Sequence, residues 1–214
     1  ELRRTVEDLD PGRKGKLTSR KLFGVIPFGN SLKRYFDSYT SAQGHIQAMM
    51  AGTDFENEQV NLVTGSGGSG RQPGSTFKMF ALAEAVREGY TIESILPAPT
   101  KAEFGPPECS EKWEPKGGPG NSQSLVSATK NSVNTTFAEL MVRLGPEEVS
   151  AMAQAMGVTS LEGEKAECSW VLGTASVNPL EMAAGFSVIA NRGVYKEPTP
   201  VTRVEFPDGR VDTF

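Results

Sequence analysis

Residues 71–90, RQPGSTFKMFALAEAVREGY, join a helix-breaking Pro-Gly pair to a long apolar segment. Pro73 and Gly74 end any preceding element, and the next breaker is Gly89, so the pattern predicts a helix over residues 75–88. Apolar side chains occur on almost every side of that helix. It is therefore expected to be buried on most faces and to form the centre of the core.

Two chemically active side chains open this predicted helix. Ser75 and Lys78 are three residues apart and so share one helical face. The helix N-terminus favours negative charge developing near Ser75. Burial would lower the pKa of Lys78, and a serine activated by a neutral lysine is a known route to an acyl-enzyme. The spacing alone is weak, because Ser127 and Lys130 repeat it in the middle of a polar helix, and an ordinary exposed lysine is the alternative.

A second polar pair follows in the helical middle of the chain. Ser132 and Asn134 interrupt the helices with a hydroxyl, which can relay a proton, and an amide, which can hold a substrate amide. The competing interpretation is local helix capping. Ser176 and Asn178 have the same spacing, and there a helix cap is the prediction.

The remaining pattern predicts a mixed α/β (α+β) domain with helices in the middle and strands at both ends. Residues 97–121 are rich in Pro, Gly and charge and predict a long surface loop. The other expected elements are a strand over 44–52, a strand or an extended approach over 59–64, helices between 124 and 157, a helix from 178 to 193, and a hairpin of 201–206 with 210–214. The first and last strands are expected to share one sheet.

Composition excludes several classes. The 214 residues carry a net charge of −4, which argues against nucleic-acid binding. No apolar run is long enough for a membrane span. One His and two Cys cannot build a Cys/His zinc site, so no metal is expected.

Gly65, Gly67 and Gly70 match a dinucleotide fingerprint, but Pro73 and the later Pro-rich loop do not fit its βαβ context. No cofactor is expected, and no G-x-S-x-G elbow accompanies His45, the single histidine.

The two cysteines, Cys109 and Cys168, leave a choice open. An extracytoplasmic location would allow a disulfide that closes a long loop, whereas a reducing compartment would leave two thiols.

Taken together, the motifs resemble the transpeptidase domain of penicillin-binding proteins. The resemblance covers roughly residues 44–206 and is closest to the bifunctional class A members. It rests on five stretches: GHIQAMMAG, RQPGSTFKMFALAEAVREGY, the Trp113-Glu114-Pro115-Lys116 segment, ATKNSVNTTFAELMVRLG, and VLGTASVNPLEMAAGFSVIANRGVYKEPTPVTRV. It implies a penicillin-binding/serine β-lactamase-like fold, with an antiparallel sheet and a helical subdomain.

The resemblance also implies roles for the four polar residues. Ser75 would attack the D-Ala-D-Ala bond of a peptidoglycan stem peptide, with Lys78 as its base. Ser132 would pass the proton to the departing D-Ala, and Asn134 would bind the substrate amide. A second stem-peptide amine would accept the acyl group, and β-lactam antibiotics would acylate Ser75.

The chain departs from the family in one motif. The third motif, Lys-Thr-Gly or Lys-Ser-Gly on a strand, is absent from residues 1–214. We therefore expect residues 44–214 to be a partial transpeptidase domain and residues 1–43 to be a linker or a poorly matched domain start. A second polypeptide is expected to carry the rest of the domain, and residues 1–214 alone are expected to be inactive.

Location and partners follow from the same resemblance. The domain is expected outside the cell membrane, anchored in the full-length protein, and working with cell-wall assembly proteins. Two alternatives remain. One is a β-lactam sensor or β-lactamase-like acyl-enzyme, and the other is a non-catalytic penicillin-binding scaffold, which the missing third motif favours.

Overall fold

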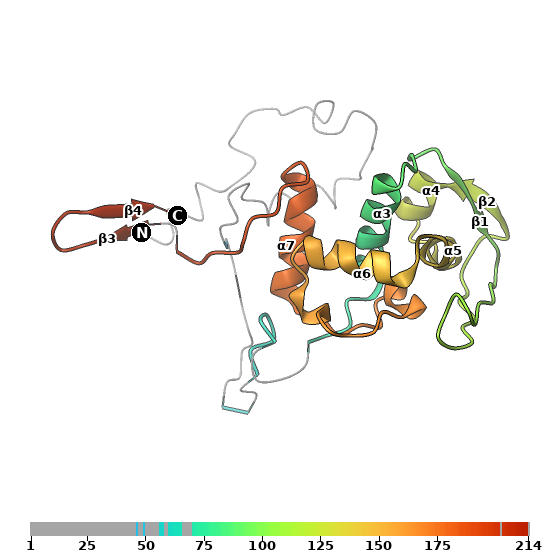
Figure 1. Cartoon of the computed structure of the whole chain (residues 1–214), viewed down its shortest axis with the longest axis horizontal. Coiled ribbons are helices and arrows are strands. Elements are labelled where there is room, and N and C mark those ends of the chain that lie inside the picture. Colours follow the sequence, from blue (N-terminus) through green and yellow to red (C-terminus); the bar gives the residue numbers. More distant parts are fainter. Residues whose placement is uncertain are drawn as a thin grey trace. The chain divides into compact units, whose positions relative to one another are not determined.

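The computed structural model describes residues 46, 49, 56, 57, 60–65, 70–201 and 203–213. Helices dominate it, with two short antiparallel strand pairs, β1 with β2 and β3 with β4 (Figure 1). The predicted α/β class is confirmed. The elements in chain order are η1 (Gly74–Phe77), α3 (Lys78–Arg87), β1 (Ile95–Ala98), β2 (Asn121–Ser124), α4 (Leu125–Lys130), α5 (Asn134–Leu144), α6 (Pro146–Ala155), η2 (Thr159–Leu161), η3 (Cys168–Leu172), α7 (Pro179–Ala190), β3 (Arg203–Glu205) and β4 (Val211–Thr213).

The core is built on α3, as the apolar sequence of this helix predicts. Phe77 and Phe80 are fully buried, and their ring centroids lie 5.1 Å apart. Burying one such side chain contributes about 2–3 kcal/mol. The helices α5 and α6 pack on α3. From α7, Gly185 approaches Phe80 so closely that a Cβ at this glycine would lie 2.9 Å from the ring. The predicted helix is thus the central element, although its first turn, η1, is a 3₁₀-helix.

The last helix, α7, begins where its sequence predicts and ends at Ala190, three residues before the predicted end at Gly193. The Asn178 side chain accepts a hydrogen bond of 2.9 Å from the backbone N–H of Glu181, and Pro179 occupies the first helical position. Gly193, with φ of +88°, lies just past the C-terminus and donates its N–H to Val188 O at 2.8 Å. The prediction that Asn178 is a helix cap is therefore confirmed.

The segment predicted as a surface loop over 97–121 is instead an extended antiparallel arm. Its base is the β1–β2 pair, with Ala98 opposite Asn121. Farther out, Phe104 pairs with Trp113 through two backbone hydrogen bonds of 2.9 Å, and their ring centroids lie 5.8 Å apart. Cross-strand ion pairs add to this, including Lys101 with Glu114 at 2.6 Å. Many Pro and Gly residues hid this pairing, because a strand is normally predicted from an unbroken β-branched run.

A second local prediction is wrong. Residues 60–64, for which the sequence predicts a strand or an extended approach, form a turn in the structure. The Asn61 side chain accepts hydrogen bonds from the N–H groups of Val63 at 3.0 Å and Thr64 at 3.1 Å. Such local capping by an Asn side chain competes with strand pairing.

Several predictions lie largely outside the described residues: the strand over 44–52, the segment 1–43, His45 and most of the glycine-rich loop. Of the strand, the structure describes Ile46 and Met49, and the Ile46 N–H donates to Thr199 O at 2.9 Å. The hairpin predicted for 201–214 is present as β3 and β4, with Val204 opposite Asp212. The shared sheet of these end strands stays a prediction.

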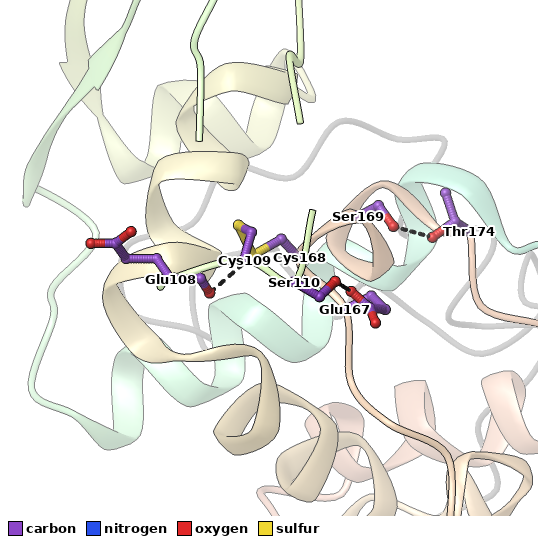
Figure 2. The surroundings of a disulfide bond; sticks show 7 residues. All are labelled: Glu108, Cys109, Ser110, Glu167, Cys168, Ser169 and Thr174. Atoms are coloured by element: carbon purple, nitrogen blue, oxygen red, sulfur yellow. Dashed lines mark hydrogen bonds between the residues drawn. A yellow bond between two sulfur atoms is a disulfide. The ribbon is translucent and has the colours of Figure 1, made fainter. Parts of the chain in front are cut away.

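A disulfide joins the arm to the helical part of the domain (Figure 2). Cys109 and Cys168 are 4% and 3% exposed, and a hydrogen bond from Ser110 to Glu167 lies beside them. Of the two states left open by the sequence, the structure contains the bridged one. The bond fixes the tip of the arm to the start of η3.

Replacing both cysteines by alanine is expected to lower the free energy of unfolding by about 4 kcal/mol, because a loop of this length then regains its entropy in the unfolded chain. The cysteines are 59 residues apart. Urea unfolding of the oxidised protein and of the C109A/C168A variant measures the difference, and the reduced wild-type protein is the control. A loss below about 1 kcal/mol would contradict a loop-closing role.

Candidate active site

The first part of the site is the turn η1 with the start of α3. Pro73 and Gly74 turn the chain into the helix, and Gly74 has a φ of +59°. Ser75 is exposed, whereas Lys78, one turn later, is only 3% exposed. The sequence therefore puts a hydroxyl on the surface and an amine directly beneath it.

The second part is the junction between α4 and α5. Helix α4 ends at Lys130, and α5 begins at Asn134. Between them, Ser132 has a φ of +52°, a left-handed conformation that is costly for a residue with a side chain. Strain of this kind is common at functional sites, where the surrounding structure imposes it. Here it turns both the hydroxyl and the carbonyl of Ser132 toward Lys78.

Lys78 Nζ connects the two parts. It lies 3.1 Å from Ser75 Oγ and 3.0 Å from Ser132 Oγ. It also donates to Ser132 O and to Asn134 Oδ1, at 2.7 Å each. The four polar residues singled out in the sequence are thus brought into one hydrogen-bonded cluster.

The buried environment of Lys78 makes the neutral amine accessible near neutral pH. Burial lowers the pKa of Lys78 from its ordinary value to about 8. Among the residues that the structure describes, none forms an ion pair with Lys78. The ring of Phe137 lies on another side, with its centroid 5.5 Å from Nζ. At neutral pH a useful fraction of this lysine can therefore act as a base.

The hydrogen bonds around Lys78 Nζ are compatible with a neutral amine. A carbonyl oxygen and an amide oxygen can only accept, so the two contacts of 2.7 Å use two Nζ hydrogens. A neutral amine has two hydrogens and one lone pair, and its lone pair is then left for a hydroxyl. Both Ser75 Oγ and Ser132 Oγ are within reach of it. The cluster can take a proton from one hydroxyl and return it through the other.

The repeat of this spacing, Ser127 with Lys130, has a different environment. Ser127 bonds to Gln123 Oε1 at 3.2 Å within the turn, and Lys130 is exposed at the end of α4. The amine of Lys130 is therefore open to solvent, whereas that of Lys78 is buried. The distinction drawn from the sequence between the two Ser-x-x-Lys pairs agrees with this geometry.

Three contributors were missed in the sequence. The Ser132 carbonyl accepts from Lys78, but a left-handed serine leaves no signal in the residue types. Phe137 follows Asn134 by one helical turn, which was the available signal for its place in the site. From the arm, Gly117 lies so near that a Cβ on it would be 3.5 Å from Asn134 Nδ2. The arm therefore borders the cluster.

Comparisons with known proteins place these residues in a family context. A family model described as "Penicillin binding protein transpeptidase domain" matches residues 39–213. Penicillin-binding protein 1A of Pseudomonas aeruginosa is 31% identical over 172 residues, which are 78% of this chain and 20% of that protein. Penicillin-binding protein 1A of Vibrio cholerae is 27% identical over 202 residues, 92% of this chain and 23% of that protein. The chain thus spans about a fifth to a quarter of the length of these curated relatives.

Solved structures show the same similarity. Penicillin-binding protein 1A of Haemophilus influenzae has a TM-score of 0.65 at 26% identity, covering 79% of this chain and 25% of that one. The imipenem acyl-enzyme complex of penicillin-binding protein A from Mycobacterium tuberculosis has a TM-score of 0.57 at 25% identity, covering 72% of this chain and 40% of that one. For PonA1 of the same species the TM-score is 0.66 at 24% identity, covering 79% and 45%, which is a likeness of fold.

Proposed function

Because the chain belongs to the penicillin-binding protein transpeptidase domain family, we propose that it supplies the nucleophile and the base of a peptidoglycan D,D-transpeptidase. The observation that carries the proposal is the position of Lys78 Nζ, within 3.1 Å of both the Ser75 and the Ser132 hydroxyl. The donor substrate is a stem peptide ending in D-Ala-D-Ala, and the acceptor is the amine of a second stem peptide.

In the acylation half, the neutral amine of Lys78 takes the proton of Ser75, and Ser75 Oγ attacks the carbonyl carbon of the D-Ala-D-Ala bond. A tetrahedral intermediate forms, and its negative charge is favoured near the backbone N–H of Ser75 at the helix N-terminus. The C–N bond then breaks. The departing D-Ala nitrogen receives the proton from Ser132, which is replenished from Lys78 over 3.0 Å.

In the second half, the acceptor amine attacks the ester carbonyl on Ser75. Its proton passes to the Lys78–Ser132 pair, the ester C–O bond breaks, and Ser75 regains its proton. A new amide joins the two stem peptides, and the protein returns to its starting state. A β-lactam enters at the first half through its strained amide, and the resulting ester lasts because the ring fragment stays attached.

Asn134 has two tasks in this scheme. Its Oδ1 accepts from Lys78 Nζ at 2.7 Å, which directs the amine hydrogens away from Ser75. Its Nδ2 faces the arm at Gly117, where it is available to the carbonyl of a substrate amide. An amide can perform both tasks, because its oxygen accepts a hydrogen bond and its nitrogen donates one.

The proposal is tested on the complete protein that carries residues 1–214, with a D-Ala-D-Ala stem peptide, a free-amine acceptor and benzylpenicillin. Release of one D-Ala for each cross-link formed supports it. Rapid, repeated hydrolysis of benzylpenicillin without cross-linking would favour a β-lactamase-like enzyme. No acylation by the stem peptide or by benzylpenicillin would favour the scaffold.

No Lys-Thr-Gly or Lys-Ser-Gly string occurs in residues 1–214, so we expect these residues by themselves to turn over neither the stem peptide nor benzylpenicillin. In the family the third motif supplies a cation, a site for the substrate carboxylate and the second oxyanion donor. Activity should therefore require a polypeptide that adds this strand, and turnover by purified 1–214 would contradict the requirement.

An extracytoplasmic location is part of the proposal, and the bond between Cys109 and Cys168 supports it because disulfides persist in oxidising compartments. Among the described residues, no helix combines the length and the apolar character that crossing a bilayer demands. Membrane anchoring and cell-wall assembly partners are proposed for the complete protein, as the family resemblance implies.

The acylation rate is expected to rise about tenfold between pH 7 and pH 9 and then level off. The reason is that Lys78, with its pKa lowered to about 8, must lose its proton before it can accept one from Ser75. The rate should rise with pH because Lys78 acts as a base. A lower pH protonates its amine and stops the reaction. Stopped-flow acylation at short times measures the profile. A rate that is flat over this range, or that falls with rising pH, would contradict the base role.

A further inference from the structure

A distant segment runs along the nucleophile turn. We call residues 168–177 the support segment and residues 70–77 the nucleophile segment. At one end, the Arg71 N–H donates to Val177 O at 2.8 Å, and the Val177 N–H donates to Arg71 O at 3.1 Å. Beside this bridge, a Cβ on Gly70 would lie 2.4 Å from Val177 O. The backbones of the two segments are therefore in direct contact just before Ser75 in the sequence.

The contact between the two segments continues past the nucleophile, and the segments run in opposite directions. Gln72 Nε2 donates to Thr174 O at 3.2 Å. At the far end, the Phe77 and Trp170 rings meet edge to face, with centroids 6.5 Å apart. Later residues of one segment thus meet earlier residues of the other, so the support segment follows the nucleophile segment over its whole length.

The closest approach is next to the nucleophile itself. A Cβ on Gly173 would lie 2.2 Å from both the N and the O of Gly74, and 2.3 Å from its Cα. Gly173 also has a φ of +82°, a backbone conformation that favours glycine. Without a side chain, its backbone can lie directly against that of Gly74. Any larger residue would push against the backbone of Gly74, which is bonded directly to Ser75. Rigid backbone atoms, unlike a side-chain end, cannot move aside without moving the nucleophile.

The support segment is itself held in place. Cys168, its first residue, is bridged to Cys109 of the arm, and the Ser169 and Thr174 hydroxyls are hydrogen-bonded at 2.8 Å across η3 (Figure 2). Val171, between them, is fully buried. The segment is therefore fixed at its start, closed by a side-chain bond and packed on the core.

We propose that Gly173 is a positioning residue, which lets the support segment hold the turn at Gly74 and so sets the place of Ser75 Oγ relative to Lys78 Nζ. This inference rests on the proposed function, because it assigns a role in acylation of Ser75. Gly173 contacts no reacting atom and acts through the backbone of Gly74.

The test compares G173A with G163A in the complete protein. Gly163 is a matched control, because its φ is +78° but nothing lies within 4 Å of a Cβ at that position. Both variants carry the same backbone penalty, and only G173A pushes on the nucleophile turn. The readouts are the noncovalent dissociation constant of benzylpenicillin, the first-order acylation rate constant, and the midpoint of thermal unfolding.

A positioning role predicts that G173A lowers the acylation rate constant by about ten- to a hundredfold, since small misplacements of a reacting group cost that much. The dissociation constant and the pH midpoint of acylation should be unchanged, and G163A should acylate at the wild-type rate. Equal acylation rate constants for G173A and G163A would overturn the inference. A lower unfolding midpoint with a smaller active fraction but an unchanged rate constant would also overturn it.

If G173A does not fold, Q72A replaces it, because that exposed side chain contributes one hydrogen bond to Thr174 O. A loss of about threefold or more in the acylation rate constant at unchanged stability supports the positioning role, and a wild-type rate overturns it. Failure of the proposed function gives a different result, since the wild-type protein would then not be acylated. In that case the positioning role fails together with it.

Discussion

Replacing Ser75 by alanine is expected to abolish both covalent labelling by benzylpenicillin and release of D-Ala. The hydroxyl of Ser75 is the exposed group over the buried amine, at 3.1 Å from Lys78 Nζ. Alanine keeps the turn and removes the atom that forms the ester. Labelling is measured as the acylated fraction in an intact mass spectrum over time.

The chain supplies a matched control in S127A. Ser127 has the same spacing to a lysine but bonds to Gln123 within its own turn. We expect S127A to be labelled at the wild-type rate. If labelling survives in S75A, another side chain is the nucleophile and the assignment fails.

Replacing Lys78 by methionine is expected to slow acylation by about a thousandfold, which lies within the usual contribution of general base catalysis. Methionine has a similar length and suits a buried position, whereas the proton of Ser75 then has no acceptor. Ser132 and Asn134 also lose their common partner. In the wild-type protein, Lys78 Nζ lies 2.7 Å from Ser132 O, 3.0 Å from Ser132 Oγ and 2.7 Å from Asn134 Oδ1. The rate constant of benzylpenicillin acylation is the measurement.

Two further variants separate the base role from the charge. K78R keeps a positive charge but cannot lose its proton at ordinary pH, so it should be as slow as the methionine variant. K130M removes the exposed lysine of the repeated pattern and should leave the rate unchanged. Wild-type activity in K78R would show that the charge of Lys78, and not its basicity, drives acylation.

The helices were predictable because their limits are local. Asn178 and Pro179 start α7, and Gly193 follows its end, so each signal lies within a few residues of the feature it determines. The arm was not predictable in the same way. Its pairing between Phe104 and Trp113 joins residues on either side of a Pro-rich tip, and only the folded register shows which charges and rings meet.

The site shows the same division. Ser75 with Lys78 and Ser132 with Asn134 were singled out by their place at helix starts and by the family resemblance, because the spacing alone is repeated elsewhere in the chain. The contact of Lys78 with the Ser132 carbonyl depends on a left-handed serine, which residue types do not reveal. The approach of Gly173 to Gly74 joins two segments far apart in the sequence, so no local pattern could indicate it.

The position of the benzylpenicillin ester in the complete protein tests the central claim most directly. After labelling, the protein is digested and the adduct is located by tandem mass spectrometry, with unlabelled protein as the reference. The account predicts one modified residue, Ser75, in the peptide that contains the Ser75–Lys78 turn. An adduct on Ser127, on Ser132 or on a residue outside the Ser75–Lys78 turn would contradict it.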